Sequence, residues 1–320
     1  RPPQELYLHQ HQKNRLMGKN IARVLLVSGS DSGGGAGLQA DIKSCEALGA
    51  FAMNAVTAIT VQNTKGVSGV IGIEPSFVQA QMDAILNDIG ADAIKTGMLA
   101  TVDIIETVAT RAQRALDNGE VRVFVVDPVM VTAAGDRLVD TDALNAIRKI
   151  LLPLATVTTP NLREAALLLD TEIPNTIEGL RDTAIKIKQR FRPDAVLLKG
   201  SFPVSSEELA PNAVRIESGD TFVVDILYDG HCLLELASPR LETRNTHGTG
   251  CTLASAIAAR LAIGDDITTA VQNARTYLQT ALRNSLHLHL GSGPCGPFLH
   301  GQSAWDRAVA SCYPSTRTIY

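Results

Sequence analysis

The sequence predicts an α/β fold in which helices cover both faces of a mostly parallel sheet. Short apolar runs alternate with longer segments of helical periodicity over most of the 320 residues, and such alternation is typical of parallel sheets. The run 121–126 is almost entirely apolar, as expected for a strand that is buried on both faces. Several runs end directly before polar or glycine-rich segments, which places candidate ligand-binding residues at one edge of the sheet.

The first elements follow from their composition. An apolar strand at 24–27 ends in Ser-Gly, and a glycine-rich loop leads to a helix at 38–48, which Gly49 ends. β-branched and apolar residues at 55–61 predict a second strand. Pro75 is well placed to start the next helix. The remaining elements of the core are helices at 75–89, 102–116, 142–152, 162–169 and 177–191 and strands at 93–96, 121–126, 156–159 and 195–198.

The last third of the chain changes character. Residues 214–236 contain two or three strand-like runs with Gly-Asp and Asp-Gly turns, which predict an antiparallel addition at the edge of the sheet. Two apolar helices follow, at 250–261 and 267–286, and the periodicity is lost after Gly291. The sequence contains no internal repeat and no linker that would divide it into two domains.

The composition excludes several classes of protein. The net charge is −4 and no long basic run occurs, which argues against nucleic-acid binding. No apolar stretch is long enough to span a membrane. The five cysteines are scattered without metal-ligand spacing, which fits free thiols in the cytoplasm. We therefore expect a cytoplasmic protein that acts on a small molecule, with one domain at 21–305, a disordered extension at 1–20 and a tail at 306–320.

The strongest local feature is the run Asn-Thr-His-Gly-Thr-Gly-Cys-Thr at 245–252, directly before an apolar helix. Gly248, Thr249 and Gly250 would let a ligand approach the backbone, and the N–H groups at a helix start attract anions. Cys251 falls in the first turn, where the same field favours the thiolate. Such a loop can hold a phosphoryl group while Cys251 takes or orients the proton of an attacking hydroxyl. The alternative is a glycine-rich helix start with an inert, buried cysteine.

A second glycine-rich loop, at 29–37, follows the first strand, at the sheet edge where open α/β folds bind ligands. Its glycines do not match the Gly-x-Gly-x-x-Gly spacing of a dinucleotide site, because Leu38 stands where the third glycine should be. A dinucleotide-dependent oxidoreductase is therefore the least favoured class. Asp41 lies one turn into the following helix, where it either contacts a ligand or is a solvated surface residue.

Polar residues also follow three of the predicted strands, namely Asp127, Asn161 and Lys199. A lysine at this edge suits a nucleotide phosphate, and Asp127 with Glu164 suits a magnesium ion, which prefers oxygen ligands. Asn161 and Glu164 are three residues apart and share one helix face. The alternative is that Asn161 caps its helix and Glu164 forms an ordinary surface pair.

Together these segments resemble the hydroxymethylpyrimidine/phosphomethylpyrimidine kinase family, whose fold is the ribokinase-like three-layer α-β-α sandwich. The resemblance runs from about Arg23 to about Trp305. It rests on seven blocks in family order: GSDSGGGAGLQADIK (29–43), TAITVQNTKGV (57–67), IKTGML (94–99), VVDPVM (125–130), TPNLREAALLL (159–169), LLKGS (197–201) and THGTGCTLASAIA (246–258).

The resemblance implies a role for each matching residue. Cys251 stands where other ribokinase-like enzymes carry an aspartate base. The anion hole beside it would be formed by Gly248, Thr249 and Gly250. The ATP-binding positions are matched by Lys199, Asp127 and Thr246, and the magnesium site by Asp127, Asn161 and Glu164. The positions that surround the pyrimidine are matched by Gln62, Asp41, Gly29, Ala36 and Met98.

The family implies ATP-dependent phosphorylation of 4-amino-5-hydroxymethyl-2-methylpyrimidine and of its monophosphate, to the diphosphate, in thiamine biosynthesis. ATP and Mg²⁺ would be required, and a homodimer is possible. Two other functions stay open: a pyridoxal or pyridoxine kinase of the same fold, and a non-catalytic regulator that binds the pyrimidine. The intact Gly-Thr-Gly-Cys loop and Lys199 favour a catalyst over a regulator.

Overall fold

The computed structural model describes residues 21–131 and 138–301. Within them the chain forms three layers, a central sheet between two sets of helices, as the fold class predicted. The extension expected at 1–20, the tail expected at 306–320 and the domain end expected at 305 lie outside the described residues.

The main sheet has a parallel centre. Within the described residues it holds ten strands in the order β10-β12-β11-β8-β7-β6-β5-β1-β2, with β9 paired to β11. Between β8 and β2 in this order, every pair of neighbouring strands is parallel. Their bounds are β1 (Arg23–Ser28), β2 (Phe51–Val56), β5 (Ala93–Thr96), β6 (Val123–Val126), β7 (Val157–Thr158) and β8 (Ala195–Leu198).

The helices largely match their predicted positions. Their bounds are α2 (Gly37–Ala47), α3 (Pro75–Leu86), α4 (Val102–Asp117), α5 (Thr141–Ala146), α6 (Leu162–Leu169), α7 (Ile177–Phe191), α8 (Thr249–Ile263) and α9 (Ile267–Asn284). The helix predicted at 142–152 continues after α5 as a π-helical turn and then a 3₁₀ turn, Leu152–Leu154. Pro153 in that last turn lacks the N–H that an α-helix needs. Of the helices described, none is both long and apolar enough to cross a membrane.

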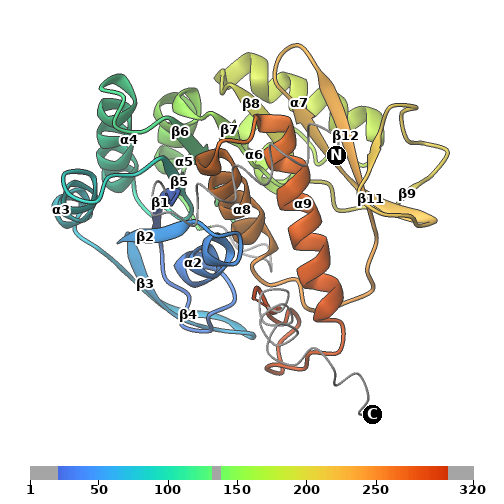
Figure 1. Ribbon diagram of the computed structural model, residues 1–320, viewed down its shortest axis with the longest axis horizontal. Helices are drawn as coiled ribbons and strands as arrows, with labels where there is room; N and C mark the ends of the chain where they lie inside the picture. Colours follow the sequence, from blue (N-terminus) through green and yellow to red (C-terminus); the bar gives the residue numbers. More distant parts are fainter. Residues whose placement is uncertain (1–20, 132–137, 302–320) are drawn as a thin grey trace, which may run out of the picture.

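Side chains of β1 alternate between two cores. Leu25 and Val27 are buried with apolar residues of α3, α4, α5, α6 and α7, whereas Val24 and Leu26 are buried with residues of α2, α8 and α9. Because successive side chains of a strand point to opposite faces, the two cores lie on opposite sides of the sheet. Figure 1 shows α2, α8 and α9 together on the near side of the molecule.

The antiparallel addition predicted at 214–236 is confirmed. β11 (Thr221–Tyr228) pairs antiparallel with β8 on one side and with β12 (Leu233–Pro239) on the other. Two short strands complete this edge, β9 (Val204–Ser205) on β11 and β10 (Val214–Arg215) on β12.

The single strand predicted at 55–61 is wrong. The chain leaves the main sheet at Thr57, and residues Ala58–Asn63 form a new strand, β3, outside it. At this point Thr57 N–H makes the last hydrogen bond between the two strands, β1 and β2, to Ser28 O (3.0 Å), and the Thr57 hydroxyl donates to Met98 O (2.8 Å). A run of apolar and β-branched residues gives no indication of these tertiary hydrogen bonds.

β3 pairs antiparallel with β4 (Gly66–Gly72), and the two strands form a separate hairpin. Figure 1 shows the hairpin projecting beyond β2, with its end beside the last described residues of the chain. Gly293 N–H donates to Thr64 Oγ1 at the turn of the hairpin (3.2 Å). A Cβ on Gly293 would overlap the backbone of Thr64, so glycine permits this close approach.

Candidate functional site

Most residues that the sequence singled out lie beyond the carboxyl ends of the parallel strands. Gly29 follows β1, Met98 follows β5 and Asp127 follows β6. Asn161 and Lys199, after β7 and β8, are joined by an isolated parallel bridge. Ligands of open α/β sheets bind at this edge, so the topology gathers these side chains where a ligand can reach them.

The start of α8 touches the first glycine loop. Gly248 takes a left-handed conformation (φ 92°), which glycine adopts without strain. A Cβ there would overlap the carbonyl oxygen of Gly35, so glycine is what allows the two loops to meet. Thr246 is exposed, and its carbonyl oxygen accepts a hydrogen bond from Thr249 Oγ1 (3.1 Å). The first N–H groups of a helix lack intrahelical partners. Thr249 N–H donates to Thr246 O (3.3 Å), which leaves the N–H groups of Gly250 and Cys251 as donors at a positive helix end.

Cys251 lies half-buried in the first turn of α8. Burial raises the pKa of Cys251 to about 12; the charge of Lys95 opposes this rise, and Asp41 and Asp127 add to it. The expectation that the helix start favours the thiolate is therefore wrong for the free protein. At neutral pH Cys251 is a neutral thiol, because desolvation outweighs the positive field.

Lys199 and Asp127 lie against the turn that starts α8. Lys199 Nζ donates to Asp127 Oδ1 (3.0 Å), which also accepts from Thr159 Oγ1 (2.9 Å). A Cβ on Gly250 would lie 3.2 Å from Lys199 Nζ. Burial lowers the pKa of Lys199, but the negative charges of Asp127 and Glu164 outweigh it and leave the pKa raised. Lys199 is therefore a permanent positive charge beside the helix end.

Asn161 and Glu164 form a capping box at the start of α6. Glu164 N–H donates to Asn161 Oδ1 (2.9 Å), and Asn161 N–H donates to Glu164 Oε2 (2.8 Å). Helix capping by Asn161, one of the two expectations, is confirmed. Glu164 is buried, which excludes an ordinary surface pair. Burial raises the pKa of Glu164 to about 7, with Lys199 opposing and Asp127 adding to the rise.

Asp127 and Glu164 fit a magnesium ion that is bound together with a phosphate ligand. In the described part of the chain, no three His, Cys, Asp or Glu side chains form a metal-binding group. Mg²⁺ is commonly held by only one or two carboxylates, with waters and substrate phosphates completing its shell. A cation would also relieve the repulsion by which Asp127 raises the pKa of Glu164.

Asp41 is buried, so it is not the solvated surface residue that was one of the two expectations. Its Oδ1 forms an ion pair with Lys95 Nζ (2.8 Å) and accepts from Ser255 Oγ (2.7 Å). Its Oδ2 is buried and has no hydrogen-bond partner among the described residues. Because buried polar atoms are nearly always hydrogen-bonded, this oxygen is suited to accept an N–H of a ligand.

Lys95 is the residue that sequence reasoning missed in this group. It lies on β5 and its side chain is fully buried. A signal was present, because a lysine inside the apolar run 93–96 of a central strand must be buried and must have a partner. The identity of that partner was not predictable, since Asp41 is 54 residues away in the sequence.

The other predicted ligand positions surround the first glycine loop. A Cβ on Gly29 would lie 2.5 Å from Met98 Cε, so Gly29 and Met98 are in contact. Ala36 directly precedes α2, and its N–H donates to Asp31 Oδ2 (2.8 Å). Gln62 reaches this loop from β3, because Ser32 Oγ donates to Gln62 O (2.8 Å).

Gln62 also lies near the start of α8. Its Nε2 is 3.3 Å from Nε2 of His247, the residue that precedes Gly248. The structure therefore brings together the residues predicted around a small ring and the residues predicted around an anion.

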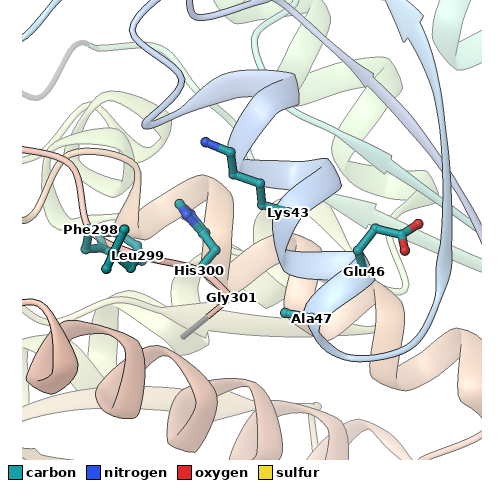
Figure 2. Close-up of a pocket in the computed structure, with 7 residues that line it drawn as sticks. All are labelled: Lys43, Glu46, Ala47, Phe298, Leu299, His300 and Gly301. Atoms are coloured by element: carbon teal, nitrogen blue, oxygen red, sulfur yellow. The ribbon is translucent and has the colours of Figure 1, made fainter. Parts of the chain in front are cut away.

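A separate pocket lies between α2 and the last described residues. Figure 2 shows its lining, which consists of Lys43, Glu46, Ala47, Phe298, Leu299, His300 and Gly301. None of the predicted site residues lines it. The candidate site is therefore the group of side chains at the strand ends, and this pocket is a different feature.

Comparison with known proteins gives consistent matches. A family model described as phosphomethylpyrimidine kinase matches residues 31–296. A probable thiamine biosynthetic bifunctional enzyme, chloroplastic, from Oryza sativa subsp. japonica is 42% identical over 277 residues, 87% of this chain and 47% of that protein. The chain thus spans about half the length of that relative. A hydroxymethylpyrimidine/phosphomethylpyrimidine kinase from Rhizobium meliloti is 41% identical over 284 residues, 89% of this chain and 98% of that protein.

A solved structure agrees with these relatives. The ADP complex of Bacillus subtilis pyridoxal kinase matches with a TM-score of 0.73 and 32% sequence identity. The match covers 89% of this chain and 100% of that chain.

Proposed function

The chain belongs to the phosphomethylpyrimidine kinase family, and from that premise we propose that it uses ATP to phosphorylate 4-amino-5-hydroxymethyl-2-methylpyrimidine and then its monophosphate, in thiamine biosynthesis. One observation carries the proposal: the turn at 248–251, the Lys199 ammonium and the Asp127 carboxylate lie within contact distance. Phosphoryl transfer depends mainly on positioning and on offsetting negative charge, which is what this group can do. We assign the activity to the domain at 21–305.

ATP binds across the strand ends, with its γ-phosphate at the N–H groups that start α8. Lys199 lies beside that turn and offsets phosphate charge. Thr246 lines the nucleotide side of the turn. Asp127 and Glu164 would hold Mg²⁺, and Asn161 fixes the Glu164 carboxyl through the capping box. When bound there, the ion would offset the negative charge that develops on the transferring phosphoryl group.

The substrate ring binds between the first glycine loop and Gln62. Gly29, Ala36 and Met98 surround it. Asp41 supplies the polar recognition, because its unpartnered Oδ2 accepts an N–H from the amino group of the pyrimidine. Lys95 keeps the other oxygen of Asp41 occupied, which leaves Oδ2 as the available acceptor.

In the transfer step, the hydroxymethyl oxygen of the substrate forms a bond to the γ-phosphorus. The bond from that phosphorus to the bridging oxygen of ATP breaks, and ADP leaves. The hydroxyl proton passes to solvent once the new bond has formed. Since Cys251 is a neutral thiol in the free protein, we assign it the role of orienting the hydroxyl. A loose transition state for phosphoryl transfer makes little demand on a base.

Pyridoxal is the second candidate substrate, because a solved pyridoxal kinase shares the fold at 32% identity. Its ring also carries a hydroxymethyl arm, but it lacks the amino group that Asp41 Oδ2 would recognise. A non-catalytic regulator is less favoured, because binding alone would not require the charged Lys199 and Asp127 at the anion turn.

The test is ADP formation by the purified protein with the hydroxymethylpyrimidine, its monophosphate and pyridoxal as separate acceptors, with products identified by mass spectrometry. We expect phosphorylation of both pyrimidines at a higher kcat/KM than that of pyridoxal. Turnover of pyridoxal alone would establish the second candidate instead. Tight binding of the pyrimidine without any ADP formation would point to the regulator.

We also propose a homodimer in the cytoplasm. The β3–β4 hairpin exposes a set of apolar side chains, Ile59, Val61, Val70 and Ile71, and large exposed apolar patches commonly mark protein contacts. A second copy of this chain is the proposed partner. A reaction that uses the Cys251 thiol suits a reducing compartment. Light scattering should give the mass of a dimer for the wild type and of a monomer for Ile71→Asp; a monomeric wild type would rule the dimer out.

A further inference from the structure

His247 connects three segments that are distant in the sequence. Its ring Nε2 is 2.9 Å from Asp31 Oδ2 in the first glycine loop and 3.3 Å from Gln62 Nε2 on β3. Its backbone N–H donates to Gly296 O in the last described segment (3.0 Å). The ring also packs on Gly35, where a Cβ would lie 2.7 Å from His247 Cδ2. A glycine at position 35 is thus what admits the imidazole.

The proton on the ring can be assigned from the chemistry of Asp31. Burial raises the pKa of Asp31, but hydrogen bonds from His247 and from the N–H groups of Ala36 and Gly33 outweigh it and lower the pKa. An ionised carboxylate can only accept hydrogen bonds. Nε2 of His247 therefore carries a proton and donates it to Asp31.

This assignment has a consequence for Gln62. An N–H group of Gln62 cannot donate to a ring nitrogen that already carries a proton. The 3.3 Å approach of the Gln62 amide nitrogen to the imidazole is therefore a contact and not a hydrogen bond. Its backbone is fixed independently, because Ser32 Oγ accepts from Gln62 N–H and donates to Gln62 O, each at 2.8 Å.

The carboxylate of Asp31 shapes the whole first loop. It accepts from the N–H groups of Gly33 (2.8 Å), Gly35 (3.0 Å) and Ala36 (2.8 Å) in addition to His247. Its side chain is only 2% exposed, so these bonds are protected from water. The residue after His247 is Gly248, which starts the anion turn and itself abuts Gly35. One side chain thus ties the loop that surrounds the ring to the turn that receives the phosphate.

We propose that His247 is a positioning residue. Through its hydrogen bond to Asp31 and its contact with Gln62, it sets the distance between the substrate ring and the turn at 248–251 that binds the transferring phosphate. This inference rests on the proposed function, since it assumes that the ring binds beside Gln62. It assigns no proton transfer to His247. If the proposal is right, replacing His247 should change the KM for the pyrimidine and leave the KM for ATP unchanged.

The test compares His247→Leu with His247→Gln in steady-state kinetics. Leucine keeps the bulk and removes the donor, whereas the amide nitrogen of glutamine reaches about as far as Nε2 and can still donate to Asp31. For H247L we expect the KM for the pyrimidine to rise roughly 10- to 100-fold, the effect of losing a hydrogen bond to a charged group, with the KM for ATP unchanged within about twofold. For H247Q the KM for the pyrimidine should stay within about threefold of the wild type.

The matched control is His231→Leu, the same change at an exposed residue in the turn between β11 and β12; it should leave every constant unchanged. Calorimetric titration with the pyrimidine alone, without nucleotide, supplies a readout that does not depend on turnover. If H247L is not recovered folded, His247→Asn replaces it, because the shorter amide cannot reach Asp31.

Three results would overturn the inference: an unchanged KM for the pyrimidine in H247L, equal rises in both KM values together with a lower melting temperature, or no rescue by H247Q. These results are distinct from failure of the proposed function, in which the wild type itself would not phosphorylate or bind the pyrimidine.

Discussion

At Cys251, desolvation and the nearby carboxylates Asp41 and Asp127 outweigh the charge of Lys95 and raise the pKa to about 12, so the thiol keeps its proton. A helix start alone is therefore a poor guide to the charge of a cysteine, because burial acts on the same group with the opposite sign. The role left for Cys251 in phosphoryl transfer is to fix the attacking hydroxyl, which affects the rate more than substrate binding.

Cys251→Ala should lower kcat roughly 100-fold, the size of effect expected for a group that handles the reacting hydroxyl, and should change the KM for the pyrimidine by less than about threefold. Cys251→Ser, which retains a polar atom, should fall between Ala and the wild type. Initial rates at saturating ATP measure both constants. Cys232→Ala is the control, because Cys232 is exposed. An unchanged kcat in C251A would remove Cys251 from the reaction.

At the scale of single elements, α8 depends on glycine at both of its ends but for different reasons. Gly248 before the helix and Gly264 after it both have positive φ values, 92° and 112°. A Cβ on Gly248 would overlap Gly35, whereas nothing lies within 4 Å of a Cβ on Gly264. Alanine substitutions at these two positions therefore distinguish the effect of backbone strain from the effect of the contact between the two glycine loops.

Gly264→Ala should lose about 1–2 kcal/mol of unfolding free energy from left-handed strain, as measured by urea denaturation. Gly248→Ala should lose more, because its Cβ also overlaps the carbonyl oxygen of Gly35. Only G248A should also lose turnover, by roughly 100-fold or more, because its methyl group pushes the anion turn away from the substrate loop. Equal kcat/KM values for the two variants would contradict the proposed importance of that contact.

The segment after α9 is anchored to α8 by His300. Its Nε2 is 2.9 Å from Thr252 Oγ1, its carbonyl oxygen accepts from Tyr277 OH (2.9 Å), and its ring stacks on Phe298 with centroids 4.6 Å apart. Burial, with the nearby charge of Lys43, lowers the pKa of His300 from 6.5 to about 4. The folded protein therefore binds fewer protons than the unfolded chain between these two pH values.

Because the unfolded chain binds more protons than the folded protein, the free energy of unfolding should fall in acid. As the pH falls below 6.5, His300 is protonated in the unfolded chain before it is protonated in the folded protein, so the unfolding free energy falls. Between about pH 7 and about pH 5 the loss attributable to His300 is roughly 2 kcal/mol. His300→Gln should remove this part of the slope in denaturation curves, and His289→Gln, at an exposed residue, should not. The same slope in both variants would count against a buried neutral His300.

For the whole molecule, periodicity and composition predicted most of the fold because the central strands are buried on both faces and most of the helices on one. The helix α8 is buried on all sides, and its apolar composition predicted it. The strand at 55–61 was wrong because the chain leaves the sheet at Thr57, whose hydroxyl bonds to Met98 O after another strand, and a contact of that kind leaves no signal in the run itself. The strand ends also predicted the gathering of Asp127, Asn161 and Lys199, since parallel strands bring their carboxyl ends to one edge.

Pairings between residues distant in the chain could not be predicted from the sequence. The two members of the Lys95–Asp41 pair are 54 residues apart, and those of the His247–Asp31 pair are 216 residues apart. Neither spacing carries a periodic signal. The charge state of Cys251 was also out of reach, because it depends on how deeply the first turn of α8 is buried. Composition and motif order thus indicate which residues matter, while burial decides what several of them can do.

The central claim is that a positively polarised turn at 248–251 receives the transferring phosphate beside a pocket for a small heteroaromatic alcohol. A crystal structure of the protein with Mg²⁺, a non-hydrolysable ATP analogue and the hydroxymethylpyrimidine tests it most directly. We predict the γ-phosphate at the N–H groups of Gly250 and Cys251, the ring beside Gln62, and the hydroxymethyl oxygen between Cys251 and that phosphate. Binding of the phosphate elsewhere, with the turn at α8 covered only by protein atoms, would contradict the account.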